Sequence, residues 1–335
     1  MSEALELPQP ASARLRGLAV AEAEVERLVA RYRTLRWRDA TRRAYRSDFA
    51  LFVGWCQAAD RPPLPAEPAT VAAFVAANAA AGAAVATIDR RLSAIATIHR
   101  ECELANPSRS PAVAEVMAGI RDEHARRPDQ RASLLASDLR RLLGALDLER
   151  AGGLRDAALL SVGFVLATRG SELAALHGRD LRRVDAGFEI RIERRKTSRR
   201  VPSSEEAKWK PVPWGSPSAG GGHRLAAWIT HAGLAPGDER PVWPAIDRHG
   251  HLRENPITGK DVTRIVKRTA ERAGMDPTKL AAHSLRRGHA TQAALAGVPE
   301  RAIMRQGDWT DARTLRGYID EAGRWEGTSA NSLGL

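Results

Sequence analysis

Cysteine is scarce in this sequence: only Cys56 and Cys102 occur among 335 residues. Two thiols are too few for a disulfide framework or for a metal site built from cysteines alone, and they suit a reducing interior. The first ten residues lack the basic stretch and apolar core of a secretory signal. No Lys-Ser or Lys-Thr follows the three glycines at 220–222, which excludes a nucleotide-binding phosphate loop there.

Long apolar runs are also missing. One charge-free stretch spans residues 69–88, but it is mostly alanine and contains Asn78 and Gly82. A membrane helix of this length would be richer in large aliphatic residues. The stretch therefore predicts two short helices of a soluble domain, and no membrane contact is expected.

Positive charge is abundant: 52 lysines and arginines face 40 acidic residues, which gives a formal net charge of +12. The excess is clustered, with seven arginines in 31–46 and nine basic residues in 179–200. Four further cations recur every four residues at Lys260, Arg264, Arg268 and Arg272. Such clusters favour a polyanionic partner, nucleic acid first. The alternative interpretation of the cations at 260–272 is a solvated helix face that binds no polyanion.

The length predicts two domains, because one hydrophobic core seldom serves so long a chain. Residues 21–122 carry apolar side chains at helical spacing, as at Phe49, Phe52 and Cys56, and predict four or five helices. Residues 1–20 are expected to be flexible, and the polar, proline-interrupted segment 123–131 has the composition of a linker. The second domain then covers 132–335, including a C-terminal tail.

Helical and strand patterns both occur in the second domain. A helix is predicted to open at Ser137 and a buried one to cover 156–167. Alternating runs at 180–184, 188–192 and 209–214 predict a small antiparallel sheet, and helices resume after residue 220. The predicted fold class is mainly α with a small antiparallel β-sheet, a helical domain followed by a mixed α+β domain.

Five short motifs stand in a fixed order in the second domain. They are Arg169-Gly-Ser-Glu172, Arg195-Lys196-Thr197, His283-Ser-Leu-Arg286, Gly307-Asp308-Trp309 and Tyr318. This order resembles the tyrosine recombinase, or phage integrase, family, in a two-domain form of the Cre or Xer type. The segments 87–95 and Asn106-Pro107 resemble that family's SAM-like core DNA-binding domain, so the resemblance covers nearly the whole chain.

The residue types suit attack on a DNA phosphodiester. Negative charge builds up on the phosphoryl oxygens, and the guanidinium groups of Arg169 and Arg286 can clamp them. His283 lies one helical turn from Arg286 and can accept a proton or bind a phosphate oxygen. Tyr318 is the one tyrosine in the catalytic half and is the candidate nucleophile. The alternative is that it is a buried core tyrosine with a purely structural role.

The resemblance implies further roles. Lys196 matches the lysine that protonates the leaving 5′ oxygen, with Lys208 and Lys210 as weaker rivals. Trp309 stands where many members have histidine; its indole can donate a hydrogen bond but cannot carry a proton between groups. Glu172 matches an acidic residue that supports the site, by orienting Arg169 or His283.

The resemblance implies a site-specific recombinase that integrates, excises or resolves DNA elements through a 3′-phosphotyrosyl link. Double-stranded DNA is the expected partner, with a homotetramer on two DNA sites and a monomer or weak oligomer without DNA, in the bacterial cytoplasm at the nucleoid. No metal and no cofactor are expected.

The alternatives are a type IB topoisomerase-like enzyme and a non-catalytic DNA-binding protein. The predicted DNA contacts are Arg42, Arg43, Arg46, Arg90, Arg91, Arg199, Arg200, Lys260, Arg264, Lys267 and Arg268.

Overall fold

The computed structural model describes residues 39–124, 132–192 and 209–322. The chain divides into two compact units, Met1–Pro128 and Asp129–Leu335. This division falls inside the segment predicted as a linker, while the finer domain boundaries stay a prediction. Within the described ranges, no helix is both long and apolar enough to cross a membrane.

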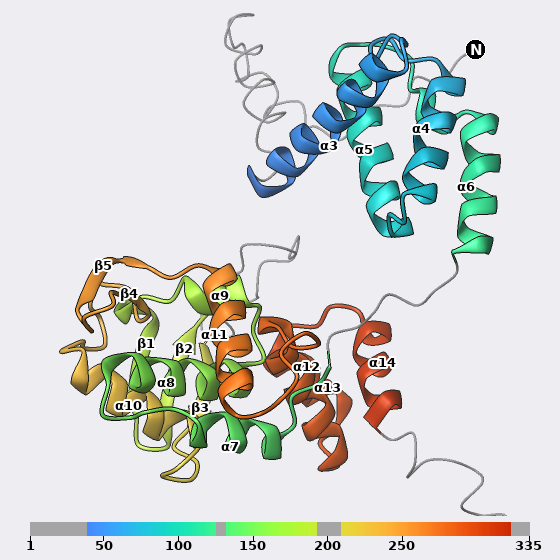
Figure 1. Ribbon diagram of the computed structural model, residues 1–335. Helices are drawn as coiled ribbons and strands as arrows, with labels where there is room; N and C mark the ends of the chain where they lie inside the picture. The colour runs from blue at the N-terminus through green and yellow to red at the C-terminus, as the bar shows by residue number, and fades with distance from the viewer. Residues whose placement is uncertain (1–38, 125–131, 193–208, 323–335) are drawn as a thin grey trace, which may run out of the picture. The chain divides into compact units, whose positions relative to one another are not determined.

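The first unit is helical throughout its described part (Figure 1). It consists of α3 (Asp39–Ala58), α4 (Pro68–Ala80), α5 (Val85–Glu101), the short 3-10 helix η1 (Pro107–Arg109) and α6 (Pro111–Glu123). Phe52 and Phe74 meet edge to face with ring centroids 5.0 Å apart in a fully buried core. The charge-free stretch 69–88 therefore contributes to two helices, as predicted, and its apolar side faces this core.

His99 is a core residue of the first unit and is fully buried. Its Nδ1 lies 2.9 Å from the Ile95 carbonyl oxygen, and its Nε2 accepts a hydrogen bond of 3.0 Å from the backbone N–H of Ala66. Both ring nitrogens therefore have partners inside the fold. This histidine ties the loop before α4 to helix α5.

The second unit combines helices with two small sheets. Its elements are α7 (Ala136–Gly144), α8 (Ala151–Leu166), α9 (Gly170–Ala174), η2 (Gly178–Asp180), β1 (Leu181–Val184), β2 (Gly187–Arg191), β3 (Trp209–Pro213), α10 (Gly221–His231), β4 (Pro244–Ile246), β5 (Leu252–Pro256), α11 (Gly259–Arg272), α12 (Ala282–Leu295), α13 (Glu300–Gly307) and α14 (Ala312–Ala322). The buried helix α8 lies against α10 and β3, and Trp228 and Trp243 are fully buried in the same core.

The predicted sheet is present as the antiparallel order β1-β2-β3. Its inward side chains alternate along the strands, with Phe188, Ile190 and Val212 buried. The two-stranded sheet of β4 and β5 corrects the prediction that helices follow residue 220. Prolines begin β4 and end β5, and every residue of β5 is exposed, so the hairpin lacks the alternating apolar pattern that marks a strand.

The last three helices lie side by side at one end of the second unit (Figure 1). A small apolar cluster holds them together and includes Ile303, Trp309, Leu315 and Tyr318. Ala167, which ends α8 in a left-handed conformation with φ of 51°, belongs to the same cluster. This packing brings the predicted site residues of four separate motifs to one place.

Candidate active site

Tyr318 is positioned by helix α14 and lies against helix α12. Its side chain is buried, with 8% of the residue exposed, and its hydroxyl oxygen lies 3.1 Å from His283 Nε2. The two rings meet edge to face at 6.3 Å, and the Trp309 ring lies 6.5 Å away on another side. The phenol is thus fixed by aromatic neighbours, and its hydroxyl lies within hydrogen-bond distance of a histidine ring nitrogen.

His283 lies in the first turn of helix α12, with part of its surface exposed and its Nε2 against the Tyr318 hydroxyl. Partial burial lowers the pKa of the imidazole below its ordinary value of 6.5, and the nearby guanidinium groups act in the same direction. Both effects favour the neutral form of the ring. A neutral ring protonated on Nδ1 leaves Nε2 free to accept the proton of the Tyr318 hydroxyl.

Arg286 lies one turn further along α12 and is buried, with 3% exposed. Its Nη1 donates to the carbonyl oxygens of Ala167 and Gly307, and its guanidinium stacks 4.0 Å from the Trp309 ring. Burial, and then the charge of Arg169, lower the pKa of Arg286 to about 10. The group therefore remains charged at neutral pH.

Arg169 and Glu172 form a pair at the start of α9. Arg169 Nη1 donates to Glu172 Oε1 at 2.8 Å, and the Arg169 backbone N–H donates to Glu172 Oε2 at 3.0 Å. Glu172 was expected to orient either Arg169 or His283, and these hydrogen bonds link it to Arg169. The short helix thus fixes both the backbone and the guanidinium of this arginine, with the side chain still 30% exposed.

Trp309 packs directly on the backbone of Gly307. A β-carbon at Gly307 would lie 1.8 Å from the Trp309 ring, so no larger residue fits there while the indole keeps this place. The ring is held between this backbone and the Arg286 guanidinium. Glycine in the Gly-Asp-Trp motif is therefore explained by packing.

Two site residues were missed or undervalued by sequence reasoning. Arg287 is almost fully buried, with 1% exposed, and its guanidinium lies 5.0 Å over the Tyr318 ring. The signal was present as a second arginine directly after the His-x-x-Arg motif. Lys210, named as a rival of Lys196, is buried on β3, and its Nζ lies 2.6 Å from Asp308. Lys196 itself, with Arg199 and Arg200, lies outside the described residues.

The basic residues of the first unit fall into two groups. Arg43 and Arg46 are exposed on α3, and Arg42 beside them is half-buried. Arg90 instead makes a two-pronged pair with the buried carboxylate of Asp48, at 2.7 and 3.0 Å, and this hydrogen bonding raises the pKa of Arg90. Arg91 donates to Asn78. These last two arginines connect helices of the bundle, a role that charge alone does not reveal.

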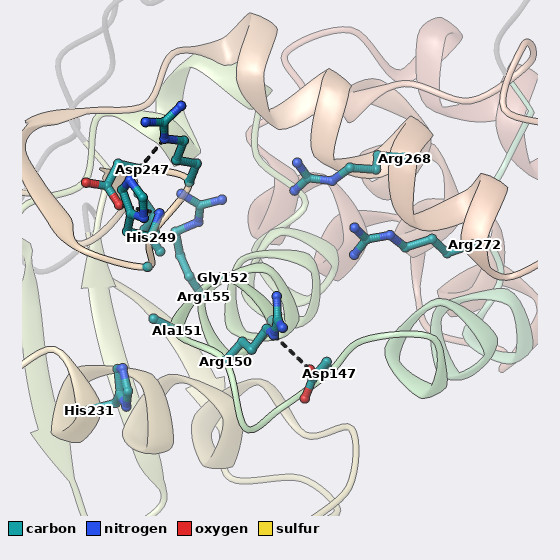
Figure 2. A pocket seen from close by; sticks show the side chains of 14 residues that line it. Asp147, Arg150, Ala151, Gly152, Arg155, His231, Asp247, His249, Arg268 and Arg272 are labelled. Carbon is teal, nitrogen blue, oxygen red and sulfur yellow. Dashed lines mark hydrogen bonds and ion pairs between the residues drawn. The ribbon is translucent and has the colours of Figure 1, made fainter.

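The predicted cationic stripe of α11 divides along the helix. Lys260 is exposed and Lys267 half-buried, whereas Arg264 pairs with Asp261 and Arg268 with Asp156, each at 2.7 Å. Arg268 and Arg272 line an open cavity of about 760 Å³ together with Arg150 and Asp147. Figure 2 shows the side chains around this cavity. The four-residue spacing drifts around the helix, so the stripe does not form one straight edge.

Metal-binding clusters are absent from the part of the chain that the structure describes: no three His, Cys, Asp or Glu side chains gather there as possible ligands. His249 and His251, which stand close in sequence, lie on the exposed β4–β5 turn, where His251 contacts Asp247. The site around Tyr318 is dominated by arginine, lysine and histidine side chains.

Comparisons with known proteins place the chain in a class. A model of the phage integrase family matches residues 132–324, and one of the phage integrase N-terminal SAM-like domain matches residues 32–103. An integrase/recombinase XerD homolog of Selenomonas ruminantium is 30% identical over 305 residues, 88% of this chain and 85% of that relative. Recombinase Cre of Escherichia phage P1 is 27% identical over 283 residues, 80% of each chain.

Solved structures agree on the fold. A lambda integrase dimer bound to a COC′ core site superposes with a TM-score of 0.60 at 16% identity, covering 96% of this chain and 83% of that one. The class is that of tyrosine recombinases, enzymes that break and rejoin DNA. The chain belongs to the phage integrase family, and it is a site-specific DNA recombinase. The topoisomerase-like and non-catalytic alternatives are not favoured.

Proposed function

We propose that Tyr318 is the nucleophile that attacks the scissile DNA phosphodiester and forms the 3′-phosphotyrosyl link. The observation that supports this assignment is the 3.1 Å contact of its hydroxyl with His283 Nε2, beside the buried charge of Arg286. A phenol with an unperturbed pKa of about 10 is only ~0.1% ionised at pH 7, which corresponds to roughly 4 kcal/mol. Proton acceptance by His283 as the attack proceeds offsets this cost.

The charge and proton balance follows from these neighbours. As the bond from Tyr318 Oη to phosphorus forms, the bond from phosphorus to the 5′ oxygen breaks. Arg169 and Arg286 stabilise the nonbridging oxygens, and the Trp309 indole donates to one of them. We assign the proton that the departing 5′ oxygen receives to Lys196. The 5′ hydroxyl can then attack the phosphotyrosyl link, so rejoining retraces the same path.

DNA binding involves both units in this proposal. Arg43 and Arg46 in the first unit and Lys260 in the second are exposed, and Lys267 is half-buried. Among the residues that the structure describes, none of these four cations forms an ion pair within 4 Å. Cations of this kind bind phosphates without regard to base sequence. Arg90 and Arg91 can bind DNA only if DNA phosphates replace their internal partners, Asp48 and Asn78.

The assembly is inferred from fold similarity. A lambda integrase tetramer bound to a Holliday junction superposes with a TM-score of 0.60 at 17% identity, covering 96% of this chain and 84% of that one. We infer a homotetramer that joins two duplex sites, formed on DNA from monomers or weak oligomers. Integration, excision and resolution of DNA elements share this chemistry, and a chromosomal substrate implies action at the bacterial nucleoid.

Trapping of the covalent intermediate tests the proposal. Nicked suicide duplexes cut from the DNA flanking the gene are incubated with the protein and resolved in denaturing detergent. The wild type should yield a DNA adduct and Tyr318→Phe none, although both bind the duplex in a gel shift. Tyr45→Phe, in the other unit, is the matched control and should retain the adduct. An adduct with Tyr318→Phe, or bound duplex without any wild-type adduct, contradicts the assignment.

A relaxation assay separates recombination from topoisomerase action. Supercoiled plasmid that lacks the trapped sequence should stay supercoiled in the presence of the wild type. Efficient relaxation of this plasmid would instead support the type IB topoisomerase reading.

A further inference from the structure

Lys210 places a buried ammonium group behind the candidate active site. The residue lies on β3 with 5% of its surface exposed. Its Nζ donates to the carbonyl oxygen of Gln306 at 2.6 Å and pairs with Asp308 Oδ2 at 2.6 Å. Both partners belong to the turn that ends α13 and leads directly into Trp309.

That turn is held from several directions. Arg286 donates to the carbonyl oxygen of Gly307, and the Gln306 amide donates to the carbonyl oxygens of Val165 and Pro211 at 3.0 and 3.3 Å. The turn is therefore bonded through its backbone to β3 and α12, and through the Gln306 side chain to α8 and β3. Every one of these elements also carries or supports a site residue.

Asp308 has an unusual conformation for its residue type. It caps α13 in the left-handed region with φ of 56°, where glycine and asparagine are the common residues and aspartate is tolerated. Its side chain is 17% exposed and pairs with Lys210. The carboxylate in the Gly-Asp-Trp motif thus has a structural partner on a different element.

The surroundings of Lys210 argue against a role as proton donor to DNA. Its ammonium is covered by protein and already bonded to a carboxylate and a carbonyl, so a leaving oxygen has no access to it in this arrangement. Burial lowers the pKa of Lys210, while the charge of Asp308 opposes this effect. An ammonium buried without a partner would be costly, and the aspartate compensates that cost.

We propose that Lys210 and Asp308 form a positioning pair that fixes the 306–309 turn and thereby holds the Trp309 ring against Arg286. The pair acts through Trp309 and not on the substrate. This inference rests on the proposed function for its kinetic consequences, but the placement of Trp309 is measurable without DNA.

The first test is spectroscopic. The indole N–H signal of Trp309, assigned by its loss in Trp309→Phe, is recorded in the free full-length protein. Both Lys210→Met and Asp308→Asn should shift or broaden it, whereas Lys279→Met, at an exposed lysine of the same unit, should leave it unchanged. Asp308→Asn keeps the lysine, and asparagine suits the left-handed conformation. This variant therefore tests the proposal if Lys210→Met does not fold. An unchanged signal in folded variants overturns the proposal.

The second test is kinetic and uses a double-mutant cycle. Lys210→Met should slow single-turnover cleavage of the trapped duplex by roughly 10- to 100-fold without weakening binding, a loss typical of misplaced site groups. In the Trp309→Phe background, the same change should cost about twofold or less, since the group through which it acts is gone. Equal losses in both backgrounds contradict action through Trp309.

A sulfur-substituted duplex separates positioning from proton donation. With sulfur at the bridging 5′ position, the leaving thiolate, of pKa about 8.5 as a thiol, needs no proton. Cleavage by Lys210→Met should remain slow on this duplex by the same factor, whereas Lys196→Met should be restored. Rescue of Lys210→Met would make it the general acid and overturn the positioning role. Failure of the proposed function appears separately, as absence of any wild-type adduct with an intact indole response.

Discussion

Protonation of His289 should couple the stability of the second unit to pH. His289 lies on α12, one turn beyond Arg286, and its ring meets Phe164 edge to face at 6.0 Å. Burial lowers its pKa from 6.5 to about 4; the charges of Lys210 and Arg286 add to this, and a hydrogen bond with the Phe164 backbone opposes it. The folded protein therefore holds this imidazole neutral.

The magnitude follows from the two pKa values of the same group. A fall from 6.5 to about 4, at about 1.36 kcal/mol per pKa unit, corresponds to about 3 kcal/mol. Between these pH values, His289 is protonated in the unfolded chain but stays neutral in the folded one. This contribution to the free energy of unfolding is thus complete above pH 6.5, declines as the pH falls, and is lost by about pH 4.

Urea unfolding of the full chain at pH 7.5 and pH 4.5, followed for the transition of the second unit, measures the effect. His289→Gln should lose stability at pH 7.5, and its deficit relative to wild type should shrink by roughly 2 to 3 kcal/mol at pH 4.5. Gln292→Ala, on the same helix, removes a hydrogen bond to the Ala136 backbone and should cost the same at both pH values. A deficit of His289→Gln that does not change with pH would refute the reasoning.

Three further predictions concern packing, orientation and charge. Gly288→Ala should destabilise the second unit by about 3 kcal/mol in urea unfolding, because its β-carbon would lie 1.7 Å from the Leu134 carbonyl oxygen. Glu172→Gln should slow cleavage about tenfold in single-turnover assays by weakening the hold on Arg169, and equal rates would contradict that role. Cleavage should continue in EDTA while DNA affinity falls steeply with salt; strict dependence on a divalent cation would contradict catalysis by the arginines.

The sequence predicts local elements well where the pattern is strong. Helices rich in periodic apolar residues and the three strands around Phe188 and Val212 follow from spacing alone. The β4–β5 hairpin does not, since prolines and exposed polar residues conceal it. Strand alternation records burial on one face, and a hairpin that buries little leaves no such pattern.

Some site residues can be identified from the sequence, whereas the roles of others depend on tertiary contacts. The order of motifs identifies Arg169, His283 and Arg286 as candidates, and the fold brings them near Tyr318. Which basic residues serve DNA and which serve the fold depends on tertiary partners: Arg90 meets Asp48 from 42 positions away. No local spacing encodes that contact, so counting positive charges overestimates the groups available to DNA.

The cations around Tyr318 differ in whether a carboxylate pairs with them. A cation without such a partner is the one best able to bind a phosphate. Glu172 is bonded to Arg169, and Asp308 to Lys210. Among the residues that the structure describes, Arg286 makes no ion pair within 4 Å. Its Nη1 donates to the neutral carbonyl oxygens of Ala167 and Gly307, although the charges of Glu172 and Asp308 also act on it. A buried guanidinium bonded only to dipoles keeps most of its charge available. In the proposed mechanism, the phosphodiester gains negative charge during attack and pairs with this guanidinium. We therefore expect Arg286 to stabilise the transition state more than the bound ground state.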